Sequence, residues 1–102
     1  MQVKFTDKAI AHLENIVDIF LEYAGERYAV KFSRLVDEKL SKLQRFPYTG
    51  FIEPLLVGRK YQYRATIIYE NYKMVYYVEG DVIWVVAFWD MRMNPERLRN
   101  IL

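Results

Sequence analysis

The stretch YRATIIYENYKMVYYVEGDVIWVVAFWD, residues 63–90, holds three runs rich in β-branched and aromatic residues. The runs are separated at residues 70–71 (EN) and 80–81 (GD), and glycine as the first residue of a two-residue loop is typical of a type II′ hairpin turn. In the first run, Ala65 and Ile67 alternate with polar residues, which is the period of two that β-strands show. The stretch therefore predicts three consecutive antiparallel strands joined by hairpins.

Counting outward from the two turns predicts which side chains share a face of the sheet, because successive strand residues point to opposite faces. One face would then carry a polar and cationic group made up of Arg64, Thr66, Lys73, Tyr77, Asp90 and Arg92. The same count adds Trp84, Val86 and Phe88 to this face, and it places on the other face Tyr72, Met74, Tyr76, Val85, Ala87 and Trp89. A slip of one residue in either turn would reverse the faces of a whole strand.

Two amphipathic helices are predicted before the strands. Apolar residues recur every three or four positions across residues 6–24, Thr6 or Asp7 can cap the first amides, and Gly25 can end the helix. The same spacing continues across residues 28–46, where a proline forbids further helix. Because so short a break joins them, the two helices should form an antiparallel hairpin that covers the apolar face of the sheet.

The remaining segments complete the predicted architecture. Residues 3–5 indicate a short strand, residues 47–60 are turn-rich and irregular, and Asn94 followed by Pro95 predicts the start of a short C-terminal helix. With 53% hydrophobic residues and no repeat or linker, the sequence predicts a single domain over residues 1–102. The expected fold class is α+β: a helical hairpin packed on one face of a small antiparallel sheet, in the order β-α-α-β-β-β with a short C-terminal helix.

Composition excludes several kinds of site. The chain has no cysteine and one histidine, His12, so disulfides, Cys/His zinc sites, cysteine nucleophiles and a Ser-His-Asp triad are ruled out. No metal ion, cofactor or small-molecule ligand is expected, and His12 is predicted to face solvent. The sequence has no export signal and no run of about 18 uncharged apolar residues, so it predicts a cytoplasmic protein without a membrane partner.

This layout and the segment YRATIIYENYKMVYYVEGDVIWVVAFWDMRMNPERL (residues 63–98) resemble the RelE/ParE superfamily of toxins from type II toxin–antitoxin systems, also known as plasmid stabilisation or addiction modules. In that family a Tyr-basic pair precedes a Tyr-basic-aliphatic strand, as at residues 63–64 and 72–76, and the next strand ends in a polar-basic motif, as at Arg92. The junction LQRFPYTG at residues 43–50 is similar to the family's helix ending. The resemblance implies a growth-inhibiting toxin that a cognate antitoxin neutralises.

The resemblance also implies roles for individual residues. Arg64, Lys73 and Arg92 stand where ribosome-dependent messenger RNA endonucleases of this family keep catalytic or phosphate-holding basic residues. Such mRNA interferases bind RNA in the ribosomal A site and cut it without a metal ion. Three positions depart from the pattern. Thr66, a candidate substrate contact, stands where RelE-like members have a second lysine, and Asp90 stands where many relatives have a histidine. Leu98 does not supply the C-terminal tyrosine that some members use.

RNA cleavage of this kind requires an activated 2′-hydroxyl, a stabilised pentavalent phosphate and a proton donor for the 5′ oxygen. Arg92 could hold the phosphate bidentately, while Arg64 and Lys73 add positive field and Lys73 is also a candidate base. Asp90 beside Arg92 should stay ionised and serve poorly as an acid, which leaves Tyr77 as a further candidate donor and substrate contact. In the alternative reading, Asp90 and Arg92 simply pair at a strand end.

The sequence is compatible with three functions from different classes. The first is ribosome-dependent mRNA cleavage, and the second is ParE-like inhibition of DNA gyrase by binding, which needs neither acid nor base. The third is an inactive toxin-like module that binds an antitoxin. The aromatic side chains Tyr77 and Trp84 could stack RNA bases, or they could be covered by residues 94–102 or by an antitoxin.

Overall fold

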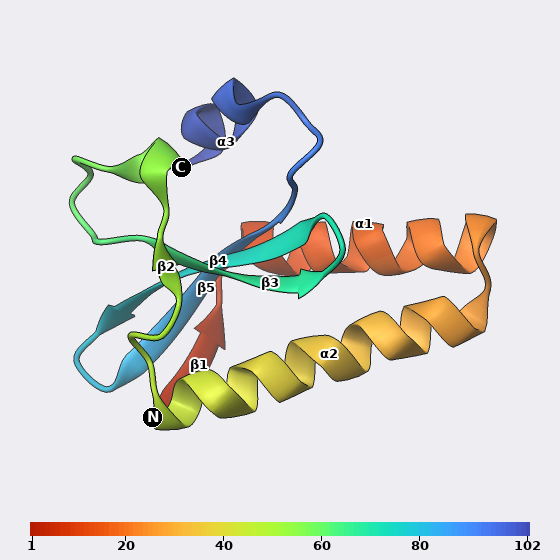
Figure 1. Cartoon of the computed structure of the whole chain (residues 1–102), viewed down its shortest axis with the longest axis horizontal. Helices are drawn as coiled ribbons and strands as arrows, with labels where there is room; N and C mark the ends of the chain where they lie inside the picture. Colours follow the sequence, from red (N-terminus) through yellow and green to blue (C-terminus); the bar gives the residue numbers. More distant parts are fainter.

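The computed structural model describes all residues, 1–102, as three α-helices packed on a five-stranded sheet (Figure 1). In chain order the elements are β1 (Gln2–Phe5), α1 (Asp7–Tyr23), α2 (Glu26–Arg45), β2 (Phe51–Ile52), the 3₁₀ turn η1 (Pro54–Leu56), β3 (Arg64–Tyr69), β4 (Tyr72–Glu79), β5 (Val82–Asp90) and α3 (Pro95–Ile101). The predicted α+β architecture, with its helical hairpin, three-stranded meander and C-terminal helix, is confirmed. A membrane-spanning helix is absent, since no helix combines the required length with the required hydropathy.

The sheet is mixed rather than wholly antiparallel. Its strand order is β1-β5-β4-β3-β2, and β3, β4 and β5 form the predicted antiparallel meander. β1 lies parallel to β5, in register from Gln2 opposite Val82 to Phe5 opposite Val85. The two-residue strand β2, in a segment predicted to be irregular, pairs with the start of β3.

The helix ends follow the residue types that predicted them. Thr6 caps α1, where its Oγ1 accepts a hydrogen bond from the amide of Ala9 at 3.2 Å. Gly25 separates α1 from α2 with a φ of 104°, a conformation that residues with a Cβ rarely adopt. Asn94 caps α3 by accepting a hydrogen bond from the amide of Glu96 at 3.0 Å. These local signals therefore hold in the folded chain.

The predicted register of β3 against β4 is wrong, because a bulge lies between Ile67 and Tyr69. Lys73 stands opposite Ile67, whereas counting from the turn at residues 70–71 places it opposite Ile68. Such a shift exchanges the two faces of a strand. Arg64 and Thr66 therefore lie on the face that the helical hairpin covers, whereas Lys73 lies on the opposite face.

A second bulge, at Val86, interrupts the pairing of β4 with β5. Beyond it Phe88 packs beneath the helical hairpin, while Ala87 and Trp89 pack on the opposite face, which is the reverse of the predicted arrangement. The predicted faces were obtained by counting residues from the turns, which assumes uninterrupted strands. Each bulge adds one residue to one strand of a pair, so the count is wrong beyond it.

Two apolar layers enclose the sheet. The helical hairpin covers one face, where Phe32 and Tyr76 are fully buried. On the other face, Leu98 of α3 packs with Leu56 of η1 and with Val75 of β4. Of the covers that the sequence left open for this second face, the structure therefore shows the C-terminal segment, and α3 lies beside the green turn η1 in Figure 1.

Replacing Leu98 with alanine should lower the free energy of unfolding by about 2–5 kcal/mol, because it leaves a cavity under α3. The side chain is 0% exposed, so no solvent contact compensates for the loss. The matched control is Arg97→Ala on the exposed side of the same helix, which should change the value by less than about 0.5 kcal/mol. Urea unfolding measures both, and equal stability of the two variants would contradict the packing of α3 on the sheet.

Candidate functional site

Lys73 and Glu53 form an ion pair inside the molecule. Lys73 projects from β4 on the face opposite the helical hairpin, and Glu53 lies between β2 and η1. Their side chains are 8% and 0% exposed, respectively. A buried charge is stable only beside a partner of opposite sign. The Lys73 ammonium is therefore engaged by the fold and shielded from any phosphate in solvent.

Arg64, the second predicted basic residue, ties β3 to the loop that follows α2. Its Nη1 donates hydrogen bonds to the carbonyl oxygens of Tyr48 at 3.0 Å and Gly50 at 2.9 Å. The hydroxyl of Tyr76 holds the same loop, because it accepts from the Gly50 amide at 3.0 Å and donates to the Pro47 carbonyl at 2.8 Å. A Cβ at Gly50 would collide with that hydroxyl, so this close approach requires glycine. Arg64 thus has a structural task on the face covered by the helices.

Asp90 and Arg92 form a bidentate pair at the end of β5. The Asp90 carboxylate accepts hydrogen bonds from Nε and Nη2 of Arg92 at 3.1 and 2.9 Å, and from the Arg92 amide at 2.9 Å. Asn71 adds a further donor at 2.8 Å. These bonds, with that from the Arg92 side chain the largest cause, lower the pKa of Asp90 to about 2. The expectation that Arg92 keeps Asp90 ionised is confirmed, and an ionised carboxylate cannot act as an acid.

Tyr77 belongs to an aromatic cluster on the same face as Lys73. Its ring stacks on Tyr61 with centroids 3.9 Å apart and meets the edge of Tyr63 at 5.6 Å. Burial and the neighbouring Tyr61 raise the pKa of Tyr77 to about 12. Such a hydroxyl holds its proton tightly near neutral pH, which makes it a weak acid in catalysis.

The six predicted site residues do not form one rim. Arg64 and Thr66 lie on the helix-covered face, Lys73 and Tyr77 lie on the other face, and Asp90 and Arg92 lie together at the end of β5. The prediction that they converge is wrong, since the two bulges reverse the faces on which it depended. Only Asp90 and Arg92 are brought into contact.

Comparison with known proteins decides the family. A sequence model described as "ParE toxin of type II toxin-antitoxin system, parDE" matches residues 3–95. The chain belongs to the ParE toxin family. A search of curated proteins gave no match.

Solved structures share the ParE fold. A chain from "Chromosomal ParDE TA system from P. aeruginosa" is 24% identical with a TM-score of 0.68, over 86% of this chain and 92% of that one. "The structure of YoeB dimer from Staphylococcus aureus" gives a TM-score of 0.57 at 16% identity, over 85% and 92% of the two chains. "YoeB/ParE toxin from Agrobacterium tumefaciens" gives 0.58 at 15% identity, over 86% and 95%. The protein is thus a toxin of a type II toxin–antitoxin system, as the sequence resemblance predicted, and the family implies a cognate antitoxin. Its fold is shared with the YoeB structures.

His12 of this ParE toxin does not simply face solvent, so that prediction is wrong. β1 ends at Phe5, which leaves the outer edge of β5 beyond Val85 without a neighbouring strand. The imidazole of His12 covers this edge, because its Nδ1 accepts a hydrogen bond from the amide of Phe88 at 3.3 Å. Burial, and then the positive charge of Lys8, lower the pKa of His12, which favours the neutral ring that this bond requires.

A hollow of about 280 Å³ lies beside His12, between α1 and the end of β5. Tyr72, Trp89 and Asp90 contribute to its wall. No cluster of three or more His, Cys, Asp or Glu side chains exists in the chain, so His12 and Asp90 lack the further ligand that a metal site would need. The wall of the hollow therefore includes the neutral imidazole of His12 and the ionised, hydrogen-bonded carboxylate of Asp90.

Replacing Asp90 with asparagine should remove an acid-sensitive part of the stability of the protein. The folded pKa of Asp90, about 2, lies below the ordinary value of 3.8. Its ionised form therefore stabilises the fold above about pH 4, and this contribution is lost as the pH falls towards 2. The Tm of Asp90→Asn should be lower than wild type at pH 7 and should converge with it at pH 2. The control Asp18→Asn, on the exposed side of α1, should follow the wild-type profile, and parallel profiles for all three proteins would contradict the pairing.

Proposed function

We propose that this toxin acts as a ParE-like inhibitor that binds DNA gyrase, and that it does not cleave messenger RNA. The observation that carries the proposal is the burial of Lys73 against Glu53, which removes the central basic residue from any phosphate site. The match to the ParE family model over residues 3–95 supports the same choice. An inhibitor that acts by binding requires no acid, no base and no converging cations.

The chemistry of RNA cleavage argues in the same direction. The candidate groups for the reaction already have other partners or the wrong pKa. Arg64 donates to loop carbonyls, and Arg92 pairs with Asp90. The pKa of the Tyr77 hydroxyl is raised to about 12, so this group does not readily donate its proton. A nuclease needs a proton acceptor and a proton donor within reach of one phosphate. The positions of these side chains on different faces do not support such a site.

Two assays run in parallel test the proposal. Purified protein is incubated with gyrase and plasmid DNA, and separately with ribosomes programmed with a messenger. We expect loss of supercoiling or accumulation of linearised DNA–gyrase complexes in the first assay and an intact messenger in the second. Induced expression should arrest growth, and co-expression of the cognate antitoxin should relieve the arrest.

Two outcomes would overturn the proposal. Cuts in the ribosome-bound messenger that Arg92→Ala abolishes would establish the nuclease instead. Normal growth on induction, together with unaffected gyrase and messenger, would establish an inactive module.

A further inference from the structure

The loop that follows α2 exposes two aromatic rings close together. Phe46 and Tyr48 are 61% and 62% exposed, and with Pro47 between them they line a hollow of about 370 Å³. Single exposed apolar residues are common on protein surfaces and mark nothing by themselves. Neighbouring apolar side chains with a polar border are instead typical of a contact surface for another molecule.

The loop that carries these rings is fastened to the sheet. The hydroxyl of the buried Tyr76 accepts a hydrogen bond from the amide of Gly50 and donates one to the carbonyl of Pro47. Arg64 donates to the carbonyls of Tyr48 and Gly50, and its guanidinium also lies over the Tyr48 ring, 5.4 Å from the centroid. Contact residues that are fixed before binding lose less conformational freedom when a partner arrives. The tether therefore presents the rings in a position ready for contact.

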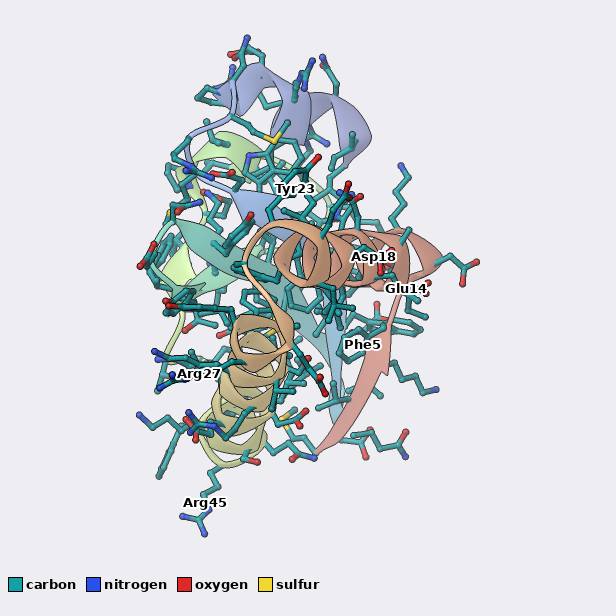
Figure 2. The ribbon with its side chains drawn as sticks, turned by 90° about the vertical axis from the view of Figure 1, so that its right-hand side faces the viewer. Phe5, Glu14, Asp18, Tyr23, Arg27 and Arg45 are labelled. Carbon is teal, nitrogen blue, oxygen red and sulfur yellow. The ribbon has the colours of Figure 1, made fainter.

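Three cations border the rings on the side of α2. Lys39, Lys42 and Arg45 line a second hollow, of about 430 Å³, to which Phe46 also contributes. Neither hollow has an acidic residue in its wall, and the three cations take part in none of the ion pairs of the molecule. In Figure 2 the labelled Arg45 extends outward from the end of α2, well away from the labelled Tyr23. The surface thus has an apolar centre and a positively charged border.

We propose that the toxin docks on gyrase through this docking surface, made up of Phe46, Tyr48, Lys39, Lys42 and Arg45. The partner surface would offer apolar pockets for the two rings, with carboxylates around them that meet the cations. Aromatic anchors at the centre and charged groups at the border are the usual arrangement of a protein–protein interface. This inference rests on the proposed function, which it deepens by naming the surface that contacts the enzyme.

A single-stranded nucleic acid is the competing occupant, because bases could stack on the rings and phosphates could contact the cations. The cations extend only from Lys39 to Arg45, however, which is about 9 Å along the helix axis. Glu38 comes next in the helix, and its side chain is 56% exposed. A nucleic-acid strand that followed α2 would meet this carboxylate, whereas a protein contact at the helix end would not. The observations therefore favour a protein partner.

The main test measures the binding of fluorescently labelled toxin to purified gyrase by anisotropy. The double variant Phe46→Ser with Tyr48→Ser should weaken binding at least about tenfold, because it removes both apolar anchors. The matched control, Tyr23→Ser with Tyr28→Ser, removes rings that are 79% and 45% exposed elsewhere on the helical hairpin. It should weaken binding by less than about threefold. All four side chains are exposed, so both variants should keep the fold.

The charged border is tested by reversing two of its cations. Lys42→Glu with Arg45→Glu should slow association with gyrase at least about tenfold at low salt, because it turns attraction into repulsion. The control Arg27→Glu with Arg97→Glu makes the same change of net charge on residues outside the docking surface. It should slow association by less than about threefold, as distant charges are largely screened.

The tether is tested by Tyr76→Phe, which keeps both exposed rings and removes the hydroxyl that holds the loop. Gyrase binding should weaken at least about threefold, because the rings must then be ordered on binding. Thermal unfolding establishes that the variant is folded at the temperature of the binding assay. Affinity equal to that of wild type would contradict the role of the tether in docking.

The outcomes separate the docking surface from the proposed function. If wild-type toxin binds gyrase, equal weakening by the two serine variants or equal slowing by the two charge reversals would overturn the docking surface alone. Wild-type toxin that does not bind gyrase would overturn the proposed function as well. Binding of a single-stranded oligonucleotide more tightly than gyrase, lost in Phe46→Ser with Tyr48→Ser, would overturn the proposal in favour of a nucleic acid. Self-association of the toxin that the same variant abolishes would overturn it in favour of a second copy of the chain.

Discussion

The buried ion pair between Lys73 and Glu53 is the constraint on which the second face of the sheet depends. It places two charges between β4 and the chain that leads from β2 into η1, and α3 then packs on η1. Removing two charges from water is costly, so the pair persists only while each partner faces the other. The same burial gives Lys73 a structural task, and the proposal that this toxin inhibits by binding rests on that task.

Much of the fold could be predicted from local sequence signals. Thr6, Gly25 and Asn94 act on their own neighbours, so the helix ends and caps follow from residue type. The order of strands in the meander follows from two short turns for the same reason. The bulges at Ile68 and Val86 could not be predicted in this way, because isoleucine and valine are ordinary strand residues. The extra residue of each bulge is accommodated by packing across the sheet. The parallel pairing of β1 is likewise a long-range contact with no local signal.

The candidate site was predictable where it depended on neighbours in sequence and unpredictable where it depended on register. Asp90 and Arg92 are two residues apart, and their pairing and the ionised state of Asp90 follow from that spacing. The convergence of Arg64, Lys73 and Arg92 required every strand residue to be counted correctly, and two bulges removed it. The sequence gave a weak indication that His12 faces the sheet, since it lies four residues before the buried Ile16 on the same helix. The open edge of β5 that His12 covers could not be inferred from the sequence. The structure holds these three basic side chains apart, and the proposed mode of action, inhibition by binding, does not need them together.

We propose that Lys73 serves the fold and takes part in no reaction. The most direct measurement is the free energy of unfolding of Lys73→Met and of the double variant Glu53→Leu with Lys73→Met, obtained by urea denaturation. The single variant leaves a buried carboxylate without a partner and should lose about 3–5 kcal/mol, while the double variant replaces both charges with apolar groups and should recover most of that loss. A Lys73→Met protein as stable as wild type would contradict this structural role, because it would mean that Lys73 is solvated and free to act elsewhere.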